Sequence, residues 1–242
     1  MAERTALYAG TRNLYHDMVT ACKSLLYHNG ADRVIFLTED DTFPESLPAC
    51  ITTLNVSTQT YFPRTGPNYT CRWTYMSFMR CAITKLFPNL SRVLTLDVDT
   101  IVNKPIDYLW DIDITPYYLA MAEEKQIKHR NHPYFNFGVT LQNLDKLRQD
   151  EADNTIISTI NNVWMQYPEQ DAVNSVCHNH ILELPPAYNA IWFNIPPVPK
   201  DEQCISHYAM SGKGFRDMPG YSTYESMSWD EILAHKDGDS HA

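Results

Sequence analysis

The chain has 242 residues, a length that permits one large domain or two small ones around a sizeable core. Its 29 acidic side chains outnumber the 19 basic ones, and the net charge of −10 argues against a general nucleic-acid binder. With 8 glycines against 15 prolines the sequence has no flexible low-complexity linker, so we predict one domain over residues 1–235 and a disordered tail over 236–242.

The N-terminal sequence, the lengths of the apolar runs and the cysteine spacing together indicate the cellular compartment. The N-terminal residues lack the apolar core of a secretory signal, and no apolar run reaches the ~18–20 residues that cross a membrane. The six cysteines form no C-x-x-C pair, which argues against a zinc ribbon or a redox motif and fits reduced thiols. We therefore expect a cytoplasmic protein without a membrane span. A trimmed form of a secretory-pathway enzyme is the alternative.

The N-terminal part of the chain alternates strands and helices. Short apolar runs predict strands at 6–9, 33–38 and 51–56, and apolar residues at helical spacing predict a helix from Tyr15 to Tyr27. This alternation is typical of an α/β fold with parallel strands. A long helix is expected over Asn68–Phe87, where apolar side chains recur every three or four residues.

The rest of the chain continues this alternation, and it contains no internal repeat. Residues 185–199 form an irregular, proline-bounded aromatic segment. We expect further strands at 92–96, 118–123, 135–141 and 181–184, and further helices from 143 onward, at 156–167, at 169–176 and at 229–234.

Two carboxylates follow the apolar strand that ends at Leu96. Asp97 and Asp99 are one residue apart, and in an extended chain their side chains point to the same side. Buried carboxylates without a partner are costly, and a cation or a metal is the usual remedy. Two hard oxygen ligands at the carboxyl end of a strand suit Mg²⁺ or Mn²⁺, at the edge where open α/β sheets bind ligands. A capped turn or a solvated strand end is the alternative for a lone D-x-D pair.

The residues around this pair resemble a known family. The segment from Leu94 to Val102, followed by Pro105-Ile106 and Leu109-Trp110, is similar to the D-x-D block of glycosyltransferase family 8. Members of that family have a single GT-A domain, an α/β fold with a Rossmann-like mixed sheet flanked by helices. They transfer a hexose from a UDP-sugar with retention of the anomeric configuration. The resemblance implies Mn²⁺, or Mg²⁺, bound by the D-x-D acids, and glucose or galactose as the transferred sugar.

Blocks on both sides of the D-x-D pair extend the resemblance over nearly the whole chain. Ala9 to Tyr15 is similar to the family's first strand-to-helix loop, which holds uridine and stacks its tyrosine on uracil. Arg80 matches a helical arginine near the donor's phosphates and metal. Tyr134 to Val139 resembles the segment whose asparagine faces the donor sugar, here Asn136.

Two later blocks complete the set. Glu169 to Asn174 resembles a family segment in which Gln170 matches an amide or carboxylate on the far face of the sugar, where it would position the donor or stabilise an oxocarbenium ion. His207-Tyr208 with Lys213 resembles the family's tail motif, in which the histidine is the third metal ligand and the lysine touches the diphosphate.

The resemblance thus assigns three sets of site residues. The implied metal ligands are Asp97, Asp99 and His207. The implied catalytic residues are Arg80, Asp97, Asp99 and Gln170. The implied donor contacts are Ala9, Thr11, Asn13, Tyr15, Arg80, Val98, Asn136, Glu169, Gln170 and Lys213.

The chain departs from the family pattern at a few of these positions. Glu169 replaces the usual aspartate, which shifts the donor-sugar contacts by about one methylene. Met210 stands where the tail motif has glycine, Gly214-Phe215 replaces Pro-Trp, and Thr11 stands where the family often has Asp or Asn. These departures affect sugar specificity and the closure of the tail more than the reaction class.

Other interpretations of the same residues remain open at this point. Asp97-Val98-Asp99-Thr100 also fits the nucleophile motif of haloacid-dehalogenase-like phosphatases, and an inactive nucleotide-sugar-binding protein is a further alternative. Cys177, His178 and His180 could form a metal cluster, although a solvated turn is favoured. The acceptor is left open between a carbohydrate, a glycolipid and a protein, contacted by loops near 57–70, 125–134 and 186–203. A homodimer is left open as well.

Overall fold

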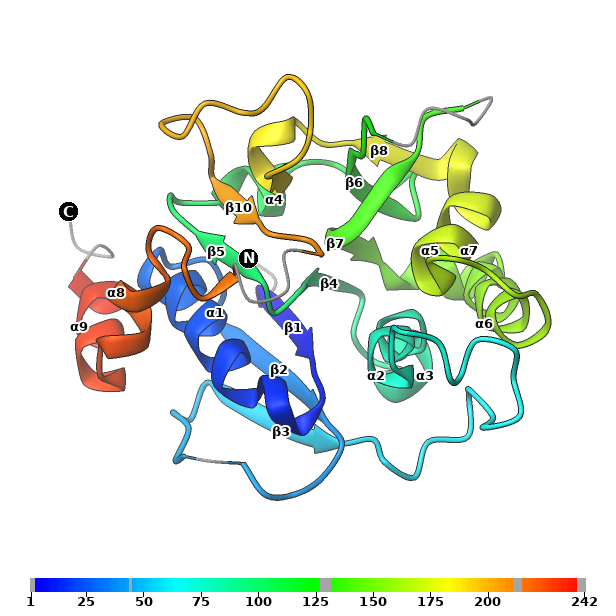
Figure 1. The fold of residues 1–242 in the computed structure, drawn as a ribbon, viewed down its shortest axis with the longest axis horizontal. Coiled ribbons are helices and arrows are strands. Elements are labelled where there is room, and N and C mark those ends of the chain that lie inside the picture. The colour runs from blue at the N-terminus through cyan, green and yellow to red at the C-terminus, as the bar shows by residue number, and fades with distance from the viewer. Residues whose placement is uncertain (1–2, 44, 127–131, 211–214, 239–242) are drawn as a thin grey trace.

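The computed structural model describes residues 3–43, 45–126, 132–210 and 215–238. Its centre is a seven-stranded sheet with the strand order β3-β2-β1-β4-β7-β6-β8 (Figure 1). Neighbouring strands from β3 to β4 are parallel, β7 is antiparallel to both of its neighbours, and β6 and β8 are parallel. The strands are β1 (Thr5–Ala9), β2 (Arg33–Thr38), β3 (Ile51–Asn55), β4 (Arg92–Leu96), β6 (Leu119–Glu123), β7 (Phe135–Asn143) and β8 (Ile181–Glu183). This mixed sheet confirms the expected α/β class.

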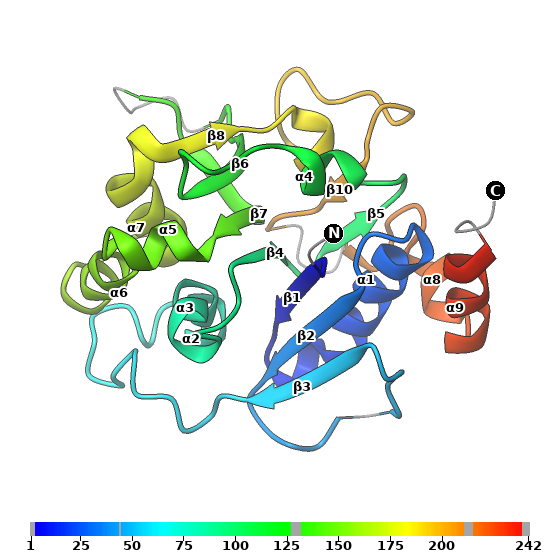
Figure 2. The same cartoon turned by 180° about the vertical axis from the view of Figure 1, so that it is seen from behind.

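Helices cover both faces of this sheet (Figures 1 and 2). Successive strand residues point to opposite faces, so Leu7 and Tyr8 of β1 belong to two different core clusters. One cluster packs against α1, α8 and α9, and the other against α2, α3, α5, α6 and α7. The helices are α1 (Tyr15–Tyr27), α2 (Tyr75–Phe78), α3 (Ile83–Leu86), α4 (Asp107–Asp111), α5 (Leu144–Gln149), α6 (Ala152–Asn162), α7 (Pro168–Cys177), α8 (Tyr221–Ser226) and α9 (Trp229–Gly238). None of the helices in the described ranges combines the length and apolar composition needed to cross a bilayer.

The helix predicted over Asn68–Phe87 is wrong, because tertiary contacts override its local periodicity. Only α2, a 3₁₀ turn at Met79–Cys81 and α3 are helical in this segment. The buried Asn68 side chain donates to the carbonyl oxygens of Ile160 and Val163, at 2.6 and 2.7 Å, and so ties its own loop to the end of α6. The break places Arg80 in the 3₁₀ turn, where its side chain is buried under the edge of the sheet.

A second, three-stranded sheet was not foreseen from the sequence. It has the order β5-β10-β9, formed by β5 (Thr100–Val102), β10 (Ile205–His207) and β9 (Ala190–Ile191). Strands of two or three residues are too short to give a periodic signal. Because His207 pairs with Thr100 in the antiparallel register, this small sheet brings the C-terminal part of the chain against the D-x-D turn.

The last helix of the described chain overlaps the predicted tail. Helix α9 extends through Gly238, so it includes residues 236–238, while 239–242 lie outside the described residues and the disordered tail stays a prediction. Ser228 and Glu231 form a reciprocal cap at the start of the helix, with the Ser228 amide donating to Glu231 Oε2 at 2.7 Å. The His235 ring stacks on Tyr27 of α1 at 3.7 Å between ring centroids, which fixes the helix to the domain.

Candidate active site

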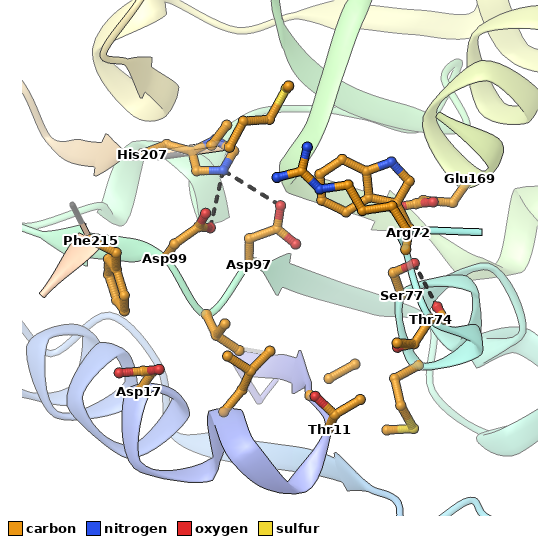
Figure 3. Close-up of a pocket in the computed structure, with 18 of the residues that line it drawn as sticks. Thr11, Asp17, Arg72, Thr74, Ser77, Asp97, Asp99, Glu169, His207 and Phe215 are labelled. Carbon is orange, nitrogen blue, oxygen red and sulfur yellow. Dashed lines mark hydrogen bonds and ion pairs between the residues drawn. The ribbon is translucent and has the colours of Figure 1, made fainter. Parts of the chain in front are cut away.

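The two aspartates and His207 meet where the two sheets adjoin. Asp97 directly follows β4, Asp99 directly precedes β5, and His207 is the last residue of β10. His207 Nε2 lies 3.3 Å from Asp99 Oδ1 and 3.5 Å from Asp97 Oδ2 (Figure 3). One ligand atom from each of the three residues falls within 4.8 Å of the others. The geometry therefore brings together the metal ligands that the sequence predicts.

Hydrogen bonds determine which His207 nitrogen faces the carboxylates. The Gly138 amide donates to Asn136 Oδ1 at 2.9 Å, so Asn189 must approach this oxygen with its NH₂ group, at 3.0 Å. Asn189 Oδ1 then faces His207 Nδ1 at 2.8 Å and accepts a hydrogen bond from its N–H group. The lone pair of neutral His207 therefore lies on Nε2, toward Asp97 and Asp99.

The site fits a divalent metal on three observations. His207 is 1% exposed, and within the described residues its Nε2 has no hydrogen-bond partner. A metal ion would satisfy this buried atom, and two carboxylates with one imidazole suit Mn²⁺ or Mg²⁺. The glycine at position 138 of β7 also makes space for the imidazole. A Cβ on this residue would lie 2.1 Å from His207 Cε1 and 2.8 Å from Asp97 Oδ2.

The buried Arg80 forms ion pairs with two carboxylates of the site. Its guanidinium lies 2.7 Å from Asp97 Oδ1 and 3.5 Å from Glu169 Oε1, and it donates to the Phe137 carbonyl oxygen at 3.1 Å. Burial raises the pKa of Asp97, but Arg80 and then His207 outweigh it and hold the pKa at about 2. The carboxylate therefore stays ionised.

The neighbouring titratable groups respond to the same environment. Burial lowers the pKa of His207, but Asp99 and Asp97 outweigh it and raise the pKa to about 10. Without a metal, the two carboxylates thus favour a proton on His207 Nε2, which a bound cation would replace. Burial raises the pKa of Glu169 above its usual value, although Arg80 partly offsets the shift. Glu169 Oε2 is buried without a hydrogen-bond partner among the described residues.

A chain of buried amides links the metal site to Gln170 on α7. Glu124 Oε2 accepts hydrogen bonds from Asn136 and from Gln170, each at 2.9 Å. The Phe137 amide donates to the other end of Gln170, at 3.0 Å. Because Asn136 also bonds Asn189, the groups from His207 to Gln170 form one hydrogen-bonded network. Gln170 is thereby fixed in orientation rather than free to rotate.

These groups line a single cavity of about 930 Å³. Its walls come from the end of β1, the loop before α2, the D-x-D turn, β7, α7, β10 and residues 215–217. This arrangement follows the rule that α/β sheets bind ligands at the carboxyl ends of their parallel strands. The predicted site residues that line it are Ala9, Thr11, Asn13, Arg80, Asp97, Val98, Asp99, Asn136, Glu169, Gln170 and His207.

Two predicted donor contacts are not part of this wall. Tyr15 is buried in the core, where its ring stacks on Phe43 at 5.1 Å and its hydroxyl accepts a hydrogen bond from the Glu39 amide at 2.9 Å. Its ring is therefore unavailable for the base stacking that the resemblance implied. Lys213 lies outside the described residues, and its predicted contact with the diphosphate stays a prediction.

Sequence reasoning missed several residues of the site. Glu124, Asn189, Asp17 and Arg72 are single polar residues in segments without a motif, so no local pattern identifies them. Asp17 on α1 reaches the cavity and is held by Arg216, with 3.0 Å between Oδ1 and Nε, and by the Tyr221 hydroxyl at 2.6 Å. Only the folded chain shows that these residues belong together.

The second metal cluster considered from the sequence does not form. Cys177 is the last residue of α7 and its side chain is buried in the core, whereas His178 begins a 3₁₀ turn and is exposed. Within the described part of the chain, Asp97, Asp99 and His207 form the one group with the geometry of a metal site. His178 is exposed, whereas His180 is partly buried and its ring lies 4.6 Å from that of Tyr118, so the three side chains do not share one solvated turn. All six cysteines are free thiols.

Comparisons with known proteins agree with this geometry. A putative glycosyltransferase of Haemophilus influenzae is 32% identical over 118 residues, which are 43% of this chain and 36% of that protein. Glycosyltransferase GlyB of Streptococcus pneumoniae is 28% identical over 189 residues, 68% of this chain and 45% of that protein. The matched regions thus span less than half the length of both relatives.

Solved structures show the same fold. The glycosyltransferase GlyE of Streptococcus pneumoniae superposes with a TM-score of 0.75 and 20% identity over 99% of this chain and 64% of that one. The galactosyltransferase LgtC, solved with donor and acceptor sugar analogs, gives a TM-score of 0.70 and 17% identity over 96% of this chain and 99% of that one. The fold is therefore GT-A. The model of the family described as Glycosyl transferase family 8 matches residues 8–213, and the chain therefore belongs to this family.

Proposed function

We propose that this protein is a metal-dependent glycosyltransferase that transfers a hexose from a UDP-sugar with retention of the anomeric configuration. The observation that carries the proposal is the buried His207 Nε2, which lies 3.5 Å from Asp97 and 3.3 Å from Asp99 in the wall of a large cavity and has no hydrogen-bond partner among the described residues. A nucleotide sugar carries its charge on a diphosphate, and release of the nucleotide concentrates negative charge there. A site of this kind suits the stabilisation of that leaving group.

The metal would be held by Asp97, Asp99 and His207, with Mn²⁺ favoured by the mixed oxygen and nitrogen ligands. When bound, Mn²⁺ supplies Lewis-acid stabilisation of the diphosphate oxygens. Arg80 keeps Asp97 ionised and fixes its carboxylate at 2.7 Å, so it acts as a positioning residue for this ligand. Asn189 orients the imidazole through Nδ1.

The sugar-binding side of the cavity is formed by β7 and α7. Glu169 offers a buried carboxylate oxygen that has no described partner, which suits a hydrogen bond from a sugar hydroxyl. Gln170 is held between Glu124 and the Phe137 amide, so its position toward the donor is preorganised. We assign Gln170 the positioning of the donor or the stabilisation of an oxocarbenium face.

The opposite side of the cavity suits the nucleotide. Ala9, Thr11 and Asn13 lie at the carboxyl end of β1, and Val98 lies within the D-x-D turn. The Thr11 hydroxyl donates to Asn13 Oδ1 at 2.6 Å, which orders this loop. We assign this wall to the uridine, without the stacking contribution from Tyr15.

Calorimetry with UDP tests the assignment of the metal site. We expect UDP binding to strengthen with Mn²⁺ and to lose this increment in Asp99→Ala. The matched control is Asp113→Ala, which removes an exposed acid outside the cavity. Metal-independent binding by the wild-type protein would contradict the proposal.

A panel of nucleotide sugars tests the reaction without knowledge of the acceptor. Each donor is incubated with Mn²⁺ and the protein, and release of free sugar is measured, with the anomer of the first product read by NMR. We expect hydrolysis of a UDP-hexose with retention. Binding without hydrolysis by any donor would favour an inactive nucleotide-sugar-binding protein. Family membership and the GT-A fold argue against the phosphatase, which hydrolysis of an aryl phosphate would instead support.

A further inference from the structure

A second cavity, of about 370 Å³, lies beside the donor cavity. The two cavities share Arg72, Trp73, Tyr167 and Met210 in their linings, so they adjoin along one wall. Tyr167, in this shared wall, is the N-cap residue of α7, the helix that carries Glu169 and Gln170. The second cavity therefore adjoins the part of the donor cavity to which the proposed function assigns the sugar. The remaining residues that line it are Cys71, Trp164, Met165 and Gln166.

The second cavity is lined by one exposed and two partly buried aromatic side chains. Trp164 is 70% exposed, and Trp73 and Tyr167 face one another with 6.4 Å between ring centroids. An exposed indole beside a cavity leaves a large apolar area available to a ligand. Indole rings stack well on the apolar faces of sugar rings, because such a contact buries C–H groups while the hydroxyls stay hydrated.

The loop that presents Trp164 is held rigidly by a buried amide. Asn68 is 1% exposed, and its Nδ2 donates to the carbonyl oxygens of Ile160 and Val163. Its Oδ1 accepts a hydrogen bond from the Met165 amide at 3.0 Å. The Cys71 amide donates to the Asn68 backbone carbonyl at 3.1 Å, so the same residue connects both walls of the second cavity. Rigid presentation lowers the entropy cost of binding.

Met210 adds a further exposed side chain at the junction. Its backbone takes φ 63°, a left-handed conformation that glycine adopts more easily, and its side chain is 46% exposed. Strained positions of this kind are found where a side chain contacts a ligand. Arg72 lies over the Trp73 ring at 5.1 Å, and in Figure 3 its guanidinium extends into the donor cavity. The junction can therefore offer both apolar contact and hydrogen-bond donors.

We propose that the second cavity binds the acceptor, and that the acceptor is a saccharide whose sugar units stack on Trp164 and Trp73. This inference rests on the proposed glycosyltransferase function and adds the class of acceptor to it. A saccharide in the second cavity would approach the donor sugar at the boundary between the two cavities, which Tyr167 and Met210 line on both sides. A hydroxyl of its terminal unit would take the hexose, and its proton would leave with the departing UDP. The predicted acceptor loops near 57–70, 125–134 and 186–203 would then contribute less than residues 71–73 and 164–167.

Binding of neutral di- to tetrasaccharides that end in glucose, galactose or N-acetylglucosamine tests this proposal. Affinities are measured by NMR titration of the full chain, with and without UDP and Mn²⁺. For the saccharides that bind, we expect Trp164→Ala to weaken binding about tenfold or more and Trp164→Phe to retain most of it. Donor hydrolysis should be unchanged in both variants. Tyr108→Ala is the matched control, because Tyr108 is also an exposed aromatic but lines neither cavity.

The outcomes separate this inference from the function on which it rests. Equal saccharide affinity in the wild type and Trp164→Ala, or no binding by any member of the panel, would overturn the acceptor site while leaving donor hydrolysis intact. Absence of donor hydrolysis and of metal-dependent UDP binding would instead contradict the proposed function. A melting temperature equal to that of the wild type shows that Trp164→Ala is folded.

Discussion

Gly138 shows how closely the chain must approach itself at the metal site. The backbone of β7 passes so near His207 that an added Cβ would lie 2.1 Å from Cε1 and 2.8 Å from Nδ1. Contacts of that length cannot persist, and the imidazole of His207 is 1% exposed, with no space to retreat. A glycine is required here for its missing side chain, because its φ angle is not among the positive ones.

Gly138→Ala should therefore displace His207 and abolish metal binding. We expect Mn²⁺ affinity, measured by electron paramagnetic resonance of the free ion, to fall more than ~100-fold, since a ligand and its partner are both moved. Gly66→Ala is the control, because Gly66 lines neither cavity. A variant that binds Mn²⁺ within twofold of the wild type would show that the β7 backbone can shift, and that our account of the site is too rigid.

Asn189 makes a different kind of contribution, because it acts on the metal only through His207. It is fully buried, and both ends of its amide are hydrogen-bonded, one to His207 and one to Asn136. Asn189→Leu keeps the volume but leaves Nδ1–H of His207 without an acceptor. We expect Mn²⁺ affinity to fall ~10–100-fold, the usual effect of losing a partner of a metal-ligating histidine.

Asn189→Asp distinguishes orientation of the ring from simple packing. The carboxylate still accepts the Nδ1 proton, so it should retain more Mn²⁺ affinity than Asn189→Leu, although its second oxygen would face Asn136 Oδ1. Thermal melting in the absence of metal gives the structural cost of each variant. If the two variants lost Mn²⁺ affinity equally at equal stability, a role in orienting His207 would be contradicted.

Some elements of the fold could be predicted from local sequence patterns, whereas others depend on tertiary contacts. Strands β1, β2 and β4 and helix α1 were predictable because each carries a periodic or continuous apolar pattern that matches its burial. Strands β5, β9 and β10 were not, because two or three residues carry no period. The segment 68–74 was predicted as the start of a long helix, but the hydrogen bonds of the buried Asn68 hold it in a loop.

The residues of the site also fall into those that a sequence motif predicted and those that only the structure identifies. Asp97, Asp99, His207 and Arg80 were identified through short motifs, and the structure brings them together. Glu124 and Asn189 carry no motif, and their roles depend on hydrogen bonds across the sheet edge. The case of Tyr15 differs, since the motif predicted the position but not the direction of the side chain, which points into the core.

An ion pair between the buried Asp153 and the partly exposed Lys85 joins two helices and gives a pH-dependent prediction. Asp153 at the start of α6 lies 2.7 Å from Lys85 Nζ and accepts from the Thr84 hydroxyl at 2.6 Å, both on α3. Burial raises the pKa of Asp153, but the hydrogen bonds from Lys85 and Thr84 outweigh it and hold the pKa below its usual value. A depressed pKa means that the ionised form stabilises the fold above about pH 4, and that this stability is lost as the pH falls further.

Asp153→Asn should therefore destabilise the protein at pH 7 by about 2 kcal/mol, because Lys85 loses its charged partner. The free energy of unfolding is measured by urea denaturation at pH 7 and at pH 3. At pH 3 the difference between the variant and the wild type should shrink. Asp145→Asn is the control, since Asp145 pairs with Arg148 at the exposed surface and should cost less than about 1 kcal/mol. A pH-independent loss would contradict the role of the charge.

Over the whole molecule, the donor cavity lies between two groups of elements. One group packs α1, α8 and α9 on the first face of the sheet, and the other packs α2, α3 and α5–α7 on the second (Figures 1 and 2). Residues from both groups line the cavity, among them Asp17 from α1 and Gln170 from α7. The C-terminal part of the chain contacts this cavity through Arg216, whose guanidinium donates a hydrogen bond to Asp17. A ligand in the cavity should therefore stabilise the molecule as a whole.

Thermal unfolding with UDP and Mn²⁺ measures this coupling. Ligand present at about one hundred times its dissociation constant adds about 2.7 kcal/mol to the free energy of unfolding. For a chain of this length that corresponds to a rise in Tm of roughly 5–10 °C. We expect a single transition that shifts as a unit, because the cavity takes residues from both faces of the sheet. Asp99→Ala should lose the part of the shift that depends on Mn²⁺. Two separate transitions, of which UDP and Mn²⁺ move only one, would show that the faces unfold independently and that the cavity is formed by one of them.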